Sequence, residues 1–170
     1  MSFGTLQSQH FAVELLTEHY FFSGALEPLG MLQNYLNHPE RVTLQFKQIS
    51  GAALDAGSKL PTLQAEEIWM RRDEILAIRF LDQLSPATMQ LLPRKEILRV
   101  FLPRFIIQAV FRCGVDTSLV DLFDTMNSYW APATDAMIHP LLQCAAPVFS
   151  AATLLLINRR HLRFYQPVKD

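Results

Sequence analysis

Short stretches of apolar residues, some of them alternating with polar residues, predict a chain dominated by β-strands. Residues 11–24 and 98–114 are rich in Phe, Val, Leu and Ile and end at a glycine, which is typical of a long strand that stops at a turn or bulge. Pro103 cannot donate to a strand ladder, so the second of these strands should bend there or lie at a sheet edge. Residues 41–49 alternate as a half-buried strand does, and residues 133–138 take the equivalent place later in the chain.

Two further pairs of apolar runs predict β-hairpins around charged turns. Residues 66–70 and 74–81 flank "RRD", and residues 153–157 and 161–168 flank "NRR". Two strand-like runs separated by a few polar residues are typical of a hairpin, so we expect each pair of runs to form one.

Apolar residues recur at helical spacing once in each half of the chain, within residues 26–38 and 116–130. Pro28 suits the first turn of a helix, and Ser118 with Asp121 resembles a capping box. We therefore expect one helix in each half. The two apolar stripes consist of Leu26, Leu29, Leu32 and Leu36, and of Leu119, Leu122, Phe123 and Met126.

The chain resembles itself when it is shifted by 90 residues. Six identities arise without a gap, and the offset falls to 87 further on, where Arg72 meets Arg159. Coincidence is the alternative, but a recurring pattern at one spacing favours a repeated structural unit. The six identical pairs are Phe11 with Phe101, Phe21 with Phe111, Gly24 with Gly114, Leu29 with Leu119, Leu32 with Leu122, and Asn37 with Asn127.

These elements predict an α+β fold, dominated by strands, with two tandem units of strand, helix, strand, strand and strand. The first unit covers 8–82, a linker with two prolines covers 83–96, and the second unit covers 97–168. A unit of this size buries too little surface to be stable alone. We therefore expect the units to pack around a pseudo-two-fold axis, share one core and form a single compact domain.

Composition and charge exclude some classes of protein. Half of the 170 residues are apolar and 18% are charged, which is not the composition of a disordered chain. The net charge of −1 makes nucleic acid an improbable partner, because phosphate binding needs a basic surface. The first residues lack a basic segment followed by an apolar run, so we expect no secretory signal and a cytoplasmic location. Residues 136–158 carry no charge, but prolines and polar residues interrupt them, so we expect no membrane span.

The sequence has no constellation of catalytic type, so we expect no catalytic, cofactor-binding or metal-binding residues and no enzyme. Cys113 with His19 or His139 is the most tempting pair, but a small packing residue beside a glycine is the simpler interpretation of Cys113. The five histidines show no metal-ligand spacing, and no glycine-rich phosphate loop is present.

Two arginine pairs are the candidate site for an anion or other ligand. Arg71 and Arg72 occupy one predicted hairpin turn, and Arg159 and Arg160 occupy the corresponding turn of the second unit. Together they could bind phosphate or an acidic partner, although charged turns are commonly just solvated. Aromatic residues could stack on bases in such a site, but their spacing favours a place in the core. These aromatic residues are Trp69, Tyr129 and Trp130.

An uncharged loop over 140–153 is the candidate interface. A loop normally lies on the surface, so an apolar loop requires a cover: the other unit, another subunit or a ligand. We expect a second copy of the chain or another protein. The possible contact residues are Leu141, Leu142, Val148 and Phe149.

Four short motifs resemble an uncharacterised family of small bacterial proteins with strand-rich domains. They are a long strand that ends in F-x-x-G, a helix with the pattern L-x-x-x-(Leu/Met)-Asn, the stretch "WAPATDAMI" and the stretch "LLLINRRHL". The resemblance covers 98–162 best and 11–80 less well. It implies the plan of a unit and no catalytic residues. The sequence therefore predicts a non-catalytic interaction or assembly module that associates with itself; binding of nucleic acid or a phosphate ligand is the alternative, and an enzyme comes third.

Overall fold

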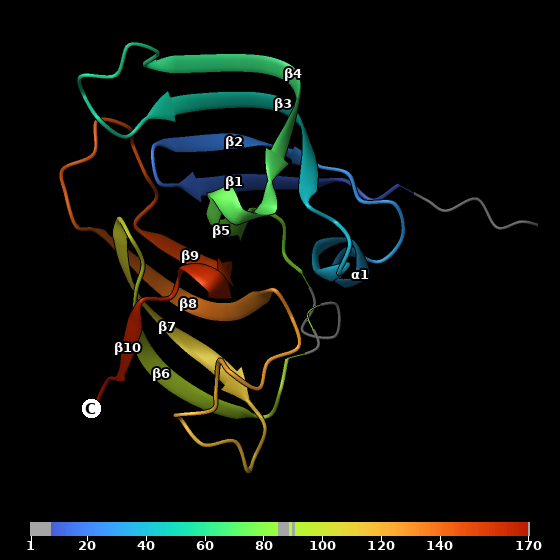
Figure 1. Ribbon diagram of the computed structural model, residues 1–170, viewed down its shortest axis with the longest axis vertical. Helices are drawn as coiled ribbons and strands as arrows, with labels where there is room; N and C mark the ends of the chain where they lie inside the picture. The colour runs from blue at the N-terminus through green and yellow to red at the C-terminus, as the bar shows by residue number, and fades with distance from the viewer. Residues whose placement is uncertain (1–7, 85–88, 90, 170) are drawn as a thin grey trace, which may run out of the picture.

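The computed structural model describes residues 8–84, 89 and 91–169 (Figure 1). Parts of the expected linker over 83–96 and of the N-terminal segment therefore lie outside the described residues. The elements are β1 (Phe11–Thr17), β2 (Tyr20–Leu26), α1 (Leu32–Asn37), β3 (Thr43–Ala53), β4 (Thr62–Arg71), the 3₁₀ turn η1 (Arg72–Glu74), β5 (Ile75–Phe80), β6 (Arg94–Phe101), β7 (Phe105–Cys113), β8 (Trp130–Pro140), β9 (Ala151–Asn158), the 3₁₀ turn η2 (Arg159–His161) and β10 (Phe164–Pro167).

The strands form one antiparallel sheet in the order β10-β6-β7-β8-β9-β5-β1-β2-β3-β4. In Figure 1, β1 to β4 lie in the upper part of the molecule, β6 to β8 lie in the lower part, and β5 and β9 meet between them. The prediction of a strand-dominated chain is confirmed.

The two long strands predicted at 11–24 and 98–114 are wrong, because each stretch is a hairpin of two strands. β1 pairs with β2, and β6 pairs with β7. In the first hairpin the hydroxyl of Thr17 accepts the Tyr20 N–H and donates to the Tyr20 carbonyl, so a side chain builds the turn in place of glycine. In the second hairpin Pro103 lies in the turn, as its missing N–H allows.

Only one of the two predicted helices is present among the described residues, and α1 is shorter than expected. Gly30 adopts a φ of 82°, which breaks the helical path after Leu26. The stretch 116–130 forms a series of turns, although Leu122 and Phe123 are buried as the apolar stripe requires. Here the Ser118 hydroxyl accepts the Asp121 N–H, and such side-chain bonds compete with helical ones.

The two predicted hairpins around the arginine turns are also wrong. β4 pairs with β3, whereas β5 lies between β1 and β9, and β10 pairs with β6. β5 is buried on both faces, which suits its place in the middle of the sheet between β1 and β9. The 3₁₀ turns η1 and η2 redirect the chain to these distant partners.

The two halves of the sheet have the same strand order: β5-β1-β2-β3-β4 and β10-β6-β7-β8-β9. In the β3–β4 ladder Thr43 faces Arg71, and in the β8–β9 ladder Trp130 faces Asn158, both 87 residues later. Each half also has a β-bulge at this offset, where Gln48 and Asp135 adopt φ values of 50° and 51°.

The 90-residue offset does not align strands. It matches Phe11, the first residue of β1, with Phe101, the last residue of β6. In the ladders, Leu16 faces Phe21 and Phe101 faces Ile106, so the matching offset in the first two strands is 85.

Buried apolar residues form two clusters rather than the one shared core that we expected. The first-half cluster contains Val13, Leu44 and Phe46, and the second-half cluster contains Phe105 and Phe111. The middle strands β5 and β9 contribute side chains to both clusters. Their contributions are Ile75, Ile78, Phe80, Leu154 and Leu156 to the first-half cluster, and Leu76, Ala77, Ala152, Leu155 and Ile157 to the second-half cluster.

The bulge at Gln48 gives a first testable prediction. Gln48→Val should lower the free energy of unfolding by about 1–2 kcal/mol, because a β-branched side chain is strained at positive φ. Gln48→Gly should leave the stability unchanged or raise it by up to about 1 kcal/mol. Urea unfolding measures both, and Gln64→Val, at an exposed strand position, is the control. Equal effects of valine at positions 48 and 64 would contradict this account of the bulge.

Candidate functional site

The candidate site is the junction where β5 of the first half pairs with β9 of the second half. The ladder has three residue pairs: Ala77 with Ile157, Ile78 with Leu156, and Arg79 with Leu155. Five of these six residues are almost fully buried, and they fill both faces of the sheet. The junction therefore joins the two halves by main-chain hydrogen bonds and by apolar packing.

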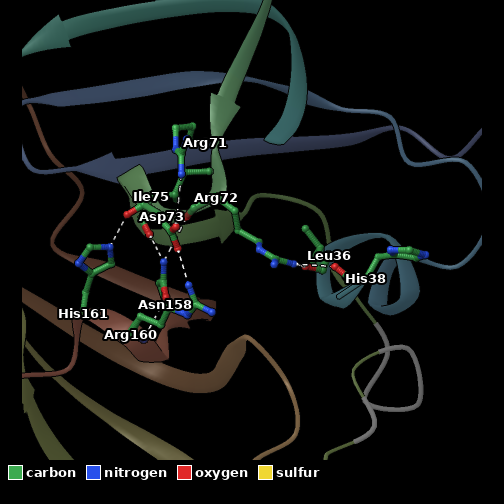
Figure 2. A network of polar contacts seen from close by, with 9 residues as sticks. All are labelled: Leu36, His38, Arg71, Arg72, Asp73, Ile75, Asn158, Arg160 and His161. Carbon is green, nitrogen blue, oxygen red and sulfur yellow. Dashed lines mark hydrogen bonds and ion pairs between the residues drawn. The ribbon is translucent and has the colours of Figure 1, made fainter. Parts of the chain in front are cut away.

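Arg72 closes one end of this junction. Its guanidinium, 7% exposed as a residue, donates through Nη1 to the carbonyls of Leu36 and His38, both at 3.1 Å (Figure 2). Its other side stacks on the ring of Tyr129 from the second half, 3.8 Å from the centroid. Burial lowers the pKa of Arg72 from its usual value, and the nearby Arg160 lowers it further.

Asn158 satisfies the main chain at the same place. Its side-chain amide donates to the carbonyls of Arg72 (3.2 Å) and Ile75 (2.9 Å), and its carbonyl accepts the Arg160 N–H (3.0 Å). Asn158 is fully buried, so water cannot replace these bonds. It thus fastens η1 of the first half to η2 of the second.

Asp73 contacts basic side chains around the two turns. It pairs with Arg160 at 3.2 Å and more loosely with Arg71 at 3.9 Å, while its carbonyl contacts the His161 ring (Figure 2). Trp130 also reaches across, donating from Nε1 to the Leu36 carbonyl at 3.3 Å.

The structure brings three of the four candidate arginines together and separates the fourth. Arg71, Arg72 and Arg160 lie around Asp73 and Tyr129, whereas Arg159 donates to the Phe123 carbonyl. Arg72 and Arg160 contact the opposite half, through Tyr129 and Asp73 respectively, whereas Arg71 and Arg159 bond within their own halves. Arg72 in particular has its Nη1 committed to carbonyl oxygens.

The uncharged loop is covered in part by the first half of the chain. Phe149 packs against Phe21 with 6.0 Å between ring centroids, and Arg79 lies 4.8 Å above its ring. Val148 packs against the second-half cluster as well. Leu141 and Leu142 remain exposed, so the four candidate interface residues divide into two covered and two free ones.

An ion pair joins the halves near the other end of this loop. Arg104 donates to Asp55 at 2.9 Å, and the hydrogen bond to Arg104 lowers the pKa of the Asp55 carboxyl. Next to it, the Ala145 N–H donates to the Leu54 carbonyl at 2.8 Å.

Cys113 does not meet a histidine. It ends β7 beside Arg94, whereas His139 pairs with Ile106 near the opposite end of the same strand. Cys113 lines a hollow of about 510 Å³, and the described residues lining that hollow include no histidine. In the described part of the chain, no cluster of three metal-ligating side chains occurs, and no helix is long and apolar enough to cross a membrane.

Both outer edges of the sheet carry a large exposed apolar side chain that sequence reasoning missed. Trp69 on β4 is 64% exposed, so its predicted place in the core is wrong, whereas Trp130 is buried as predicted. Phe164 on β10 is 59% exposed. Beside β10 is a hollow of about 400 Å³, whose lining includes Phe123, Arg159, Arg160, Leu162, Arg163 and Tyr165.

Comparison with known proteins gives no relative: no protein-family model, no curated protein and no solved structure matches this chain. The function is therefore argued from the geometry of the junction and of the sheet edges.

Replacing Asn158 tests the polar contacts of the junction. Asn158→Leu should lower the free energy of unfolding by about 2–5 kcal/mol, because two buried carbonyls and one N–H lose their partner. The control Arg71→Ala removes an exposed side chain just before η1. It should change the free energy of unfolding by less than about 0.5 kcal/mol. Denaturant unfolding measures both, and a small effect of Asn158→Leu would show that the network is dispensable.

The Asp55–Arg104 pair predicts a pH dependence. The folded-state pKa of Asp55 is lowered, so its contribution is present above the unfolded pKa and is lost as the pH falls through the folded pKa. Unfolding curves of wild type and Asp55→Asn should therefore differ near neutral pH and converge in acid. Asp116→Asn, at an exposed turn, is the control; a difference independent of pH would contradict the assignment.

Proposed function

We propose that this protein is a non-catalytic interaction module that associates with itself through the outer edges of its sheet. One observation carries the proposal: among the described residues no strand pairs with the outer side of β4 or β10, and both strands expose a large apolar side chain. Natural proteins usually protect such edges, because unpaired strands invite pairing with another chain.

The proposal includes a chain built from two related units. What supports it is the common strand order of the halves, the 87-residue difference between the β3–β4 and β8–β9 ladders, and the matching bulges at Gln48 and Asp135. A unit that already binds a neighbouring unit within the chain has a surface adapted to bind one in another chain.

We also place the protein in a reducing compartment, the cytoplasm, because Cys113 and Cys144 are free thiols. Ligand binding by the arginine pairs is less well supported. Arg72 already donates to two carbonyls, and Arg160 is paired with Asp73.

Light scattering over a range of protein and salt concentrations tests self-association. We expect wild type to form an oligomer and Trp69→Lys to lose it, because a charge at the edge opposes strand pairing. Val120→Lys, at an exposed position in a turn, is the matched control and should keep the wild-type mass. A wild-type protein that is monomeric at every concentration would overturn the proposal.

A further inference from the structure

The internal junction joins two strands whose counterparts in the other half lie at the ends of the strand order. Within the chain, the fifth strand of the first half, β5, pairs with the fourth strand of the second half, β9. The strands in the same positions of the other half are β10 and β4, and these two lie at the outer edges of the sheet. Among the described residues, each chain therefore exposes one strand of each kind that the junction joins.

The outward-facing N–H and C=O groups of β4 and β10 alternate in the same way as those that β9 and β5 use to pair with each other. The Arg72 N–H bonds the Val42 carbonyl, so in the alternating antiparallel pattern Met70 also faces β3 and Trp69 faces outward. The Val168 N–H bonds the Ile97 carbonyl, so Gln166 and Phe164 face β6 and Tyr165 faces outward. In the internal junction, Ile78 and Leu156 occupy these two outward positions and face each other.

We infer that copies of this chain associate head to tail, with β10 of one copy pairing antiparallel with β4 of the next in the register of the β5–β9 junction. This inference rests on the proposed self-association and specifies its geometry. The 87-residue offset gives three pairs: Tyr165 with Trp69, Phe164 with Met70, and Gln166 with Ile68.

The second half exposes an apolar face where the first half covers one. Leu54 and Ala77 are fully buried against the second-half cluster. Leu141 and Phe164, 87 residues later, are 48% and 59% exposed. Phe101, which corresponds to the buried Leu16, stacks on Phe164 at 4.2 Å and extends this face. A second copy bound at β10 would cover these residues as the second half covers their counterparts.

The hollow beside β10 accommodates the indole of Trp69. In the chain, Leu156 of β9 reaches the first-half cluster and is buried there with Ile75 and Ile78. Trp69 takes the place of Leu156, and Leu162 and Tyr165, which line the hollow, take the places of Ile75 and Ile78. A larger side chain thus enters a site that is open among the described residues.

Cationic side chains line the hollow that Trp69 would enter. They are Arg159, Arg160 and Arg163, with Asp124 as the single acidic residue of its described lining. Arginine binds the face of an indole, so these groups favour Trp69 as the side chain that fills the hollow.

Pro167 sets the length of the contact. Its counterpart Phe80 lies one residue beyond the last pair of the β5–β9 ladder, so a residue without an N–H is tolerated there. The contact joins two different surfaces, so it is heterologous: it produces a ring if the rotation between copies closes and a filament if it does not.

A mixing experiment tests the head-to-tail geometry. Copy A carries Trp69→Lys, which blocks β4, and copy B carries Leu141→Lys with Phe164→Lys, which block the β10 face. At a concentration where wild type is oligomeric, each should be a monomer alone, and an equal mixture should form a dimer of twice the chain mass. Circular dichroism and urea unfolding verify that each variant is folded.

Disulfide trapping between copies A and B tests the register by a readout other than mass. In a Cys144→Ser background, Ile68→Cys in copy B and Gln166→Cys in copy A should form an intermolecular disulfide under mild oxidation. These residues are a non-hydrogen-bonded pair, in which Cα atoms lie about 4.5 Å apart. Glu66→Cys with Gln166→Cys, shifted by two residues or about 7 Å, is the control and should cross-link at least tenfold less.

The outcomes separate the inference from the proposal beneath it. If wild type is an oligomer but the mixture of A and B stays monomeric, or if B alone keeps the wild-type mass, the head-to-tail geometry is wrong while self-association stands. Equal cross-linking at residues 66 and 68 would overturn the register. A wild-type protein that is always monomeric would overturn both.

Discussion

The pairing of β5 with β9 is the contact on which the rest of the structure depends. The ladder is only three residue pairs long, yet the side chains on its two faces enter two different buried clusters. Neither half can bury its middle strand without the other half. The short ladder is sufficient because the area buried on both faces, rather than the number of hydrogen bonds, supplies most of the stabilisation.

The polar contacts at the end of this ladder give the junction its specificity. Apolar packing tolerates small shifts of one half against the other, whereas Asn158 and Trp130 of the second half reach main-chain carbonyls at fixed positions in the first half. A slip of one residue would leave the buried Asn158 amide and the Trp130 indole N–H without acceptors. The register is therefore fixed by the buried donors, because losing their acceptors would cost the most free energy.

Much of the strand content could be predicted from the sequence, and the partners of the strands could not. The alternation over 41–49 and the runs at 66–70 and 74–81 lie in β3, β4 and β5, apart from at most two residues at an end, and the 87-residue offset equals the difference between two ladders. The β1–β2 turn escaped notice because it has no glycine, proline or asparagine and is formed by the Thr17 hydroxyl. The exposure of Trp69 escaped notice because alternation shows that a strand has two faces but not whether a second element covers the outer one.

The β5–β9 pair also has a consequence for how the chain is made. Ala151, where β9 begins, follows Phe80, where β5 ends, by 71 residues. Translation adds about 5–20 residues per second, so β9 is synthesised about 4–14 s after β5. Until then the edge of β5 that pairs with β9 has no partner within its own chain. During that interval the nascent first half presents an unpaired apolar strand, and a neighbouring nascent chain offers it the same kind of partner. Synthesis rate and crowding on the messenger, and not only the stability of the finished fold, therefore govern how much of this protein folds as separate chains.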